Sequence, residues 1–223
     1  LTVRGSGGGS GGGVDAELIV VDDGSTDRTH ARLMELRATR PWLRVLHRPK
    51  PMGQSAAMYA GIQAARGRWI ATLDADLQND PADLPRMLDL TRGGDVDMVQ
   101  GDRSHGRRDN LIRRYGSIVG RKARLWIVHD PIRDTGCSAR VVRADLAKRF
   151  PLTFKGMHRF MPAYARMLGA RIAEMPVNHR PRVAGTTKYG LGLLNRGISG
   201  FFDALAVRWM MKRYRDTAAQ EQA

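Results

Sequence analysis

ELIVVDDGSTD, residues 17–27, joins a short apolar run to a polar turn, and this transition decides the fold. The β-branched residues of the run predict a buried strand. Gly24 then allows a tight turn, and the Ser-Thr pair after it can cap the next helix. Capping accounts for the hydroxyl groups. It does not explain why two adjacent carboxylates, Asp22 and Asp23, follow a buried strand.

A second stretch, WIATLDADLQNDP at residues 69–81, repeats the pattern of an apolar run that ends in acidic residues. Asp74 and Asp76 are separated by one residue, so both carboxylates can turn toward one divalent cation. Oxygen ligands suit Mg²⁺ or Mn²⁺, and the side-chain carbonyl of Gln78 can add another. The plain alternative is an ordinary surface turn, because an Asp-x-Asp triplet often occurs by chance.

Short apolar runs alternate with segments of helical periodicity throughout the first hundred residues. The strand-like runs are residues 17–21, 43–47, 69–73 and 97–101, and the helical segments are 26–38, 53–66 and 81–90. Strands separated by helices predict an α/β fold, with a mostly parallel sheet and helices on both faces. Ligands bind such sheets at the carboxyl ends of the strands, where both acidic pairs fall.

The distribution of charge divides the chain into two halves. The formal net charge is +15, and residues 1–101 contribute −1 whereas residues 102–223 contribute +16. A basic half of this kind suits nucleic acid, anionic lipid or phosphorylated substrates. Aromatic residues make up only 6% of the chain and do not alternate with basic ones, which argues against a nucleic-acid-binding module.

The cysteines and histidines of the chain limit which disulfide and zinc sites it can form. Cys137 is the only cysteine, which excludes an intrachain disulfide and is compatible with a reducing compartment. The six histidines are scattered, so the sequence does not suggest a Cys/His zinc site.

Two segments of the basic half have amphipathic helical spacing. In residues 111–126 apolar positions recur between arginines, and in residues 194–209 an apolar stripe is followed by basic residues. Basic amphipathic helices can lie in a membrane interface, although packing against the sheet explains each stripe equally well. The sequence has no uninterrupted apolar run near the ~20 residues of a spanning helix.

RVAGTTKY, residues 182–189, places two cations around a glycine and two hydroxyl groups. Arg182 can bind phosphate through two hydrogen bonds, and Lys188 supplies a point charge, which together suit a clamp over phosphates. On composition alone, a solvated basic loop is the more common explanation.

Five stretches in this order resemble the family 2 glycosyltransferases, especially the dolichyl- and undecaprenyl-phosphate sugar transferases. They are IVVDDGSTD (19–27), GQSAAMYAGIQAARG (53–67), LDADLQNDPADLP (73–85), DTGCSARVVRADL (134–146), and FKGMHRFMP with NHRPRVAGTTKYG within 154–190. Each motif alone is weak, but the ordered set is specific and covers roughly residues 15–212. The resemblance implies a Rossmann-like GT-A fold and metal-dependent, inverting transfer of a sugar from a nucleotide-diphospho-sugar to a polyprenyl phosphate.

The resemblance also assigns roles to individual residues. The nucleotide sugar is implied to contact Asp22, Asp23, Asp74, Arg182, Thr187 and Lys188. The Mg²⁺ or Mn²⁺ ion is implied to bind Asp74, Asp76 and Gln78, and Arg103 is implied to approach the acceptor phosphate. A further acceptor-side arginine is one of Arg113, Arg114 and Arg121. The implied location is peripheral, at the cytoplasmic face of the bacterial inner membrane.

One feature departs from the family pattern. Residues 1–13 read LTVRGSGGGSGGG where such enzymes have a first strand and a nucleotide-supporting turn. We expect this tract to be disordered. The expected organisation is then a GT-A domain at residues 14–190 that lacks its first strand, followed by an amphipathic interface helix and tail at 191–223. The alternatives are a GT-A transferase that acts on a polysaccharide or glycan, and an inactive remnant that binds a membrane or partner.

Overall fold

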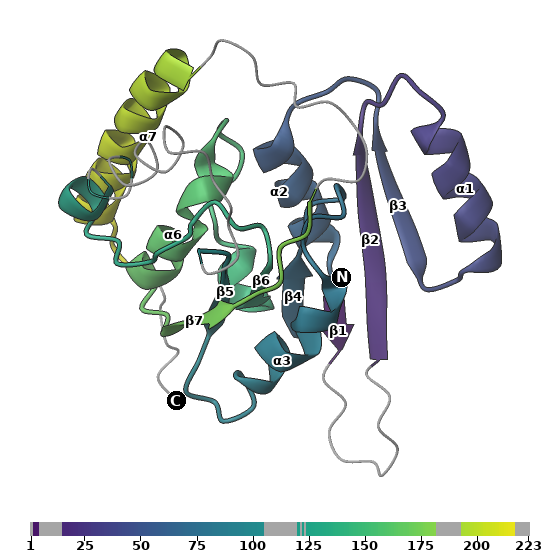
Figure 1. Cartoon of the computed structure of the whole chain (residues 1–223), viewed down its shortest axis with the longest axis horizontal. Coiled ribbons are helices and arrows are strands. Elements are labelled where there is room, and N and C mark those ends of the chain that lie inside the picture. The colour runs from purple at the N-terminus through teal and green to yellow at the C-terminus, as the bar shows by residue number, and fades with distance from the viewer. Residues whose placement is uncertain are drawn as a thin grey trace, which may run out of the picture.

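The computed structural model describes residues 2–4, 15–104, 120, 122, 124–181 and 193–216, and its centre is a seven-stranded sheet (Figure 1). The strands are β1 (Thr2–Arg4), β2 (Asp15–Asp23), β3 (Leu43–Arg48), β4 (Trp69–Thr72), β5 (Met98–Asp102), β6 (Arg140–Arg143) and β7 (Ile172–Pro176). The helices are α1 (Thr29–Thr39), α2 (Gln54–Ala64), η1 (Pro81–Asp83), α3 (Leu84–Asp89), α5 (Ala144–Ala147), η2 (Met157–Phe160), α6 (Met161–Met167) and α7 (Leu193–Arg213).

Five of these strands run in one direction and two run against them. The order across the sheet is β3-β2-β1-β4-β6-β5-β7. β2 pairs in parallel with β3, and β5 with β7, whereas β1 and β6 are each antiparallel to both of their neighbours. The five co-directional strands confirm the predicted α/β sheet. The short strands β6 and β7, and the reversal of β6, were not predicted.

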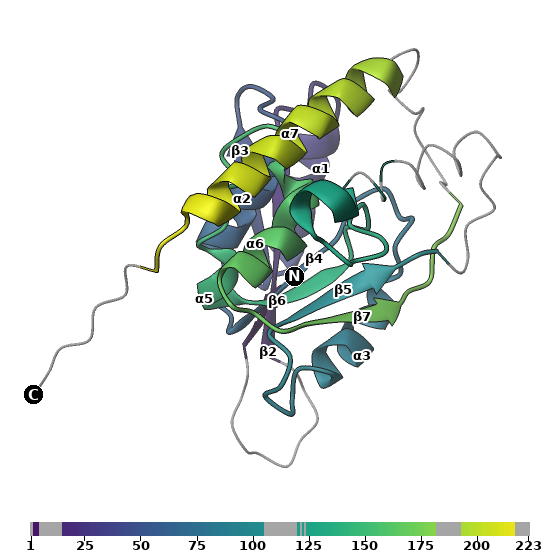
Figure 2. The ribbon, with the colours of Figure 1, turned by 90° about the vertical axis from the view of Figure 1, so that its left-hand side faces the viewer.

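Alternate side chains of the central strands fill an apolar core on each face of the sheet, as strand geometry requires. In β4, Ile70 joins a large core with α2, α6 and α7, whereas its neighbour Ala71 joins a smaller core with α3. Met98 and Val99 repeat this division in β5. The smaller core also holds Cys137, and burial raises the pKa of its thiol. Helices therefore cover both faces, as predicted (Figures 1 and 2).

The structure corrects the expectation that the first thirteen residues contribute nothing to the sheet. Thr2–Arg4 forms β1, which lies between β2 and β4 and pairs with the beginning of each strand: Thr2 is opposite both Glu17 and Ile70. Strand pairing uses backbone groups, and the facing edges of β2 and β4 leave such groups to be satisfied. Three residues therefore suffice for a short strand. The rest of the predicted disordered tract, Gly5–Gly13, lies outside the described residues.

Helix α7 divides its apolar residues between the core and the surface. Ala204 and Val207 are buried in the large core. Phe202 and Trp209, from the predicted stripe, are each 62% exposed, and the guanidinium of Arg213 lies 5.8 Å from the centre of the Trp209 ring system. Packing against the sheet thus does not explain these two stripe residues. Among the described helices, none combines the length and the hydrophobicity needed to cross a membrane.

A serine–histidine contact joins the start of α2 to η2. The hydroxyl of Ser55, which is buried, lies 2.8 Å from Nδ1 of His158 and accepts a hydrogen bond from the His158 amide at 3.3 Å. Burial, together with the charges of Arg159 and Arg140, lowers the pKa of His158 from 6.5 to about 4. The folded chain therefore favours neutral His158.

We predict that folding stability falls as the pH drops from about 6.5 to about 4. In this range the unfolded chain binds a proton at this histidine and the folded chain does not, which costs at most about 3–4 kcal/mol of folding free energy. His158→Gln cannot titrate and should lose less stability over the same range. Urea unfolding of both proteins at several pH values measures the difference. Equal losses in the two proteins would assign the titration to another group.

Candidate active site

The carboxyl edge of the sheet holds the described residues that were expected to carry chemistry. β2 ends at Asp22 and Asp23, β4 runs into Asp74, and β5 leads to Arg103. Because β6 is antiparallel to β4 and β5, the residues that precede it reach the same edge. The loops after the parallel strands and the loop before β6 therefore meet there.

Asp23 orders the loop that begins α2. Its carboxylate accepts hydrogen bonds from the amides of Met52, at 3.1 Å, and Gly53, at 2.6 Å. Gly24 makes this approach possible, because its φ is +75° and an added Cβ would lie 2.7 Å from the Pro51 nitrogen. A carboxylate that accepts amide hydrogen bonds at a helix start also suits the helix dipole. The predicted nucleotide-binding residue Asp23 therefore has a clear structural task.

Gln54, in the first turn of α2, connects the two acidic strand ends. Its side-chain amide donates a hydrogen bond of 2.8 Å to Oδ1 of Asp74. Asp23 thus positions the helix start that delivers Gln54, and Gln54 orients a carboxylate of the second acidic pair. Gln54 was not among the residues predicted to carry chemistry, although it lies in one of the family-like motifs.

The loop after β4 is organised around the buried hydroxyl of Ser138. Ser138 Oγ accepts hydrogen bonds from the Asp74 amide at 3.0 Å and from the side-chain amide of Asn79 at 2.7 Å. Within the loop, the Gln78 amide donates to Asp76 Oδ1 at 3.2 Å. Asp74, Asp76 and Gln78 are all half-buried in one short loop. Their spacing in the sequence therefore translates into neighbouring positions at the sheet edge.

Arg103 makes a two-point ion pair with Asp134. Its Nε and Nη2 donate to the two carboxylate oxygens at 2.7 and 3.1 Å. Burial acts to lower the pKa of Arg103, but the hydrogen bond and charge of Asp134, together with smaller contributions from Cys137 and Asp74, raise that pKa above its usual value. Asp134 was not predicted as a partner of Arg103, although it opens the motif at 134–146. This pair holds the predicted acceptor-side arginine in a fixed orientation.

A second cation lies entirely inside the protein, on β6. Arg140 is 1% exposed and donates to the Gln100 side-chain oxygen and the Thr135 carbonyl, each at 2.7 Å. Burial lowers its pKa to about 10, so it remains charged at neutral pH. Asp74 and Asp134 are among the charges that stabilise it. The arginine fixes the start of β6 and adds positive potential beneath the acidic loop.

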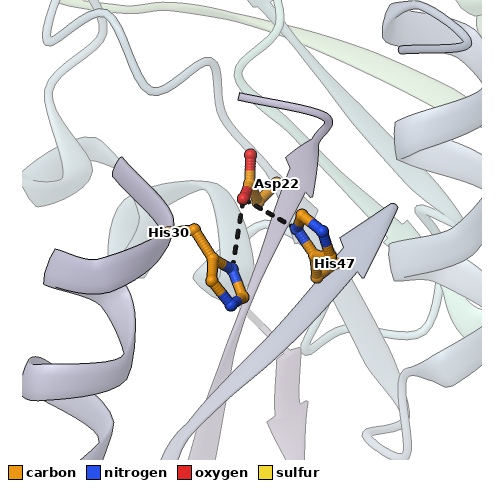
Figure 3. A group of neighbouring side chains, drawn as sticks. All are labelled: Asp22, His30 and His47. Carbon is orange, nitrogen blue, oxygen red and sulfur yellow. Dashed lines mark hydrogen bonds and ion pairs between the residues drawn. The ribbon is translucent and has the colours of Figure 1, made fainter. Parts of the chain in front are cut away.

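Asp22 takes different partners from its neighbour Asp23. Its Oδ1 accepts from the Ser25 amide at 3.0 Å, and its Oδ2 lies 3.0 Å from Nδ1 of His47 and 3.3 Å from Nδ1 of His30 (Figure 3). The Ser25 side chain, the Ser25 amide and His47 stabilise the charged form more than burial disfavours it. They hold the pKa of Asp22 at about 2.

The basic residues expected near the phosphates lie outside the described part of the chain. These are Arg113, Arg114 and Arg121 on the acceptor side, and Arg182, Thr187 and Lys188 of the phosphate loop. Among the described residues, only Asp22, His30 and His47 form a convergent group of three His, Cys, Asp or Glu side chains.

Comparisons with known proteins identify related sequences. A sequence model described as Glycosyl transferase family 2 matches residues 13–150, more than half of the chain. The chain is 39% identical to a dodecaprenyl-phosphate galacturonate synthase of Rhizobium johnstonii, over 88% of this chain and 58% of that protein. It is 34% identical to an undecaprenyl-phosphate 4-deoxy-4-formamido-L-arabinose transferase of Edwardsiella ictaluri, over 80% of this chain and 54% of that protein. The chain thus spans little more than half the length of these relatives.

Solved structures share the fold at lower sequence identity. Glucosyl-3-phosphoglycerate synthase of Mycobacterium tuberculosis, in complex with phosphoglyceric acid, has a TM-score of 0.56 and 22% identity, over 86% of this chain and 68% of that one. A mannosyltransferase of Pyrobaculum calidifontis, in complex with GDP-Man and Mn²⁺, has a TM-score of 0.54 and 17% identity, over 88% and 61%. These neighbours establish the GT-A fold predicted from the sequence.

We predict that Ser138→Ala destabilises the loop after β4. The substitution leaves the Asp74 amide and the Asn79 side chain without their acceptor, and each unsatisfied group costs about 1–3 kcal/mol. Urea unfolding should therefore show a clear loss, whereas Thr26→Ala, at an exposed position of the first acidic loop, should be almost neutral. Equally small losses in both variants would mean that Ser138 does not organise this loop.

Proposed function

Because this chain belongs to glycosyl transferase family 2, we propose that it transfers a sugar from a nucleotide-diphospho-sugar to a polyprenyl phosphate, with inversion at the anomeric carbon. The observation that carries the proposal is the Gln54–Asp74 hydrogen bond, which joins the two acidic strand ends into one site. The curated relatives are named for dodecaprenyl- and undecaprenyl-phosphate products, which supports this class of acceptor.

The acidic loop after β4 has a donor set that fits a hard divalent cation. Asp74, Asp76 and Gln78 offer oxygen atoms, which suit Mg²⁺ or Mn²⁺ better than softer metals. The hydrogen bond from Gln54 orients Asp74, and the Gln78 amide orients Asp76. Such an ion, when bound, offsets the negative charge of a diphosphate.

The chain's own residues then align the acceptor and stabilise the leaving group. An acceptor phosphate is already ionised at neutral pH, so its oxygen attacks the anomeric carbon without a strong general base. Asp134 orients Arg103, and in this proposal Arg103 pairs with that phosphate. The negative charge that develops on the departing nucleoside diphosphate is stabilised by Arg182 and Lys188, with the hydroxyl of Thr187. Asp22 and Asp23 define the nucleotide side of the site.

The surface of α7 supports access to a lipid acceptor. Phe202 and Trp209 are exposed on this helix, and Lys212 and Arg213 follow in its last turn. Apolar side chains beside basic ones favour a membrane interface that carries anionic lipid. The net charge of +16 over residues 102–223 acts in the same direction. We therefore propose peripheral binding at the cytoplasmic face of the bacterial inner membrane.

We predict metal-dependent transfer that requires Asp76. With UDP- and GDP-sugars as donors and polyprenyl phosphate as acceptor, labelled lipid should form only with Mg²⁺ or Mn²⁺. Asp76→Asn removes a charged ligand, so it should weaken nucleoside-diphosphate binding at least about tenfold in calorimetry and abolish transfer. Asp95→Asn, at a side chain that is 90% exposed, should leave both unchanged. Nucleoside-diphosphate binding that needs no metal and is equal in the wild type, Asp76→Asn and Asp95→Asn would contradict the proposed cation site. Absence of lipid product with every donor would contradict polyprenyl phosphate as the acceptor.

We predict salt-sensitive flotation with liposomes that contain anionic lipid. The double variant Phe202→Ser/Trp209→Ser should bind at least about tenfold more weakly, because each side chain contributes roughly 1.5–3 kcal/mol when fully buried in an apolar phase. Trp42→Ser removes an exposed tryptophan between α1 and β3 and should leave flotation unchanged. High salt should weaken binding of all these proteins by screening. Wild-type protein that does not float with the anionic liposomes at low salt would contradict the proposed membrane binding through α7.

A further inference from the structure

Two histidines and an aspartate from three different elements converge beside the first acidic turn (Figure 3). Asp22 is the penultimate residue of β2, His30 lies in the first turn of α1, and His47 is near the end of β3. The Asp22 side chain is fully buried, whereas His30 and His47 are 41% and 40% exposed. The cluster is therefore anchored from inside and open to solvent at its rim.

The distances within the cluster match those between ligands of one metal ion. Zinc–nitrogen bonds of about 2.0–2.1 Å in a tetrahedral site place neighbouring ligand atoms about 3.3 Å apart. Asp22 Oδ2 lies 3.3 Å from Nδ1 of His30 and 3.0 Å from Nδ1 of His47, and the second contact is a hydrogen bond that a bound ion would replace. All three ligand atoms lie within 4.8 Å of one another.

Hydrogen bonding alone does not satisfy this cluster. Nδ1 of His30 is buried and has no hydrogen-bond partner, although it lies 3.3 Å from a carboxylate oxygen. The second oxygen of Asp22 accepts from the Ser25 amide, which fixes the carboxylate as an outer-shell partner does in metal sites. A metal ion between the three groups would give the His30 nitrogen the partner it lacks.

Helix α1 also needs an anchor that its packing does not supply. None of its residues is buried, and its N-cap residue, Arg28, makes no side-chain capping hydrogen bond. His30 is the α1 side chain that reaches Asp22 at the sheet. A bond through His30 would tie the helix to the ends of β2 and β3.

We propose that Asp22, His30 and His47 bind a divalent transition-metal ion of the zinc class. The mixed nitrogen and oxygen donors distinguish this site from the oxygen-only loop of Asp74 and Asp76. Three protein ligands leave a fourth position for water or another small ligand. In this proposal the ion fixes α1, through His30, beside the nucleotide side of the edge.

A cobalt titration of the full chain tests the site independently of sugar transfer. Co²⁺ alone is added after treatment with chelator, in excess Mg²⁺, because Mg²⁺ occupies oxygen sites and competes poorly for imidazole. We expect one equivalent to bind with visible absorption typical of nitrogen-ligated, low-coordinate cobalt, and Zn²⁺ to displace it. Thermal unfolding, followed by circular dichroism, should shift upward when Zn²⁺ is added.

Matched histidine variants locate the bound ion. His30→Gln and His47→Gln should each weaken Co²⁺ binding at least about tenfold and remove the Zn²⁺-induced thermal shift. His129→Asn is the control histidine, because asparagine tolerates the positive φ of 53° at that position. It should retain both signals, as should Asp76→Asn.

Two results would overturn the proposal. One is a wild-type protein that neither develops the cobalt spectrum nor gains thermal stability with Zn²⁺, which leaves the cluster as a set of hydrogen-bonded side chains. The other is binding that persists unchanged in both His30→Gln and His47→Gln, which places the ion elsewhere. Neither result bears on sugar transfer, which depends on Asp76.

Discussion

The common direction of β2, β4 and β5 decides where chemistry can occur in this protein. Each strand must satisfy its backbone hydrogen bonds within the sheet, and side chains become free to converge only where the strands end. The reversal of β6 adds to this edge, since it brings Asp134 and Ser138 toward loops that belong to other strands. Every polar contact of the candidate site depends on this shared edge.

The polar groups at the edge act in chains rather than as separate ligands. The Asp23 carboxylate accepts from a backbone amide at the start of α2. The side chain of Gln54, in the first turn of that helix, donates to the Asp74 carboxylate, and Ser138 Oγ accepts from the Asp74 backbone amide. Such networks restrict rotamers before any ligand binds, which lowers the entropic cost of ordering the site. The family resemblance thus acquires a physical meaning, because the motif residues include the supporting groups as well as the ligands.

The sequence predicted those parts of the fold that have strong periodicity and missed those that depend on distant contacts. The apolar runs that became β2 to β5 were recognisable, whereas β6 (RVVR) has only two apolar residues between arginines and the apolar residues of β7 (IAEMP) are interrupted by a glutamate. β1 was unpredictable because three residues beside a glycine tract carry no pattern of their own. The pairing of Arg103 with Asp134 joins residues 31 apart. His30 and His47 are neighbours because α1 packs beside β3, which no spacing in the sequence reveals.

The buried thiol of Cys137 has a practical consequence for spectroscopy. This cysteine is the only one in the chain, it is fully enclosed, and burial raises its pKa, so little reactive thiolate forms at neutral pH. Maleimide dyes and spin labels should therefore leave the folded protein unmodified. A cysteine introduced on an exposed face would then carry the only label, without removal of the native residue from the core. The signal of a dye or spin label then reports only on the chosen surface position, because no other cysteine is labelled.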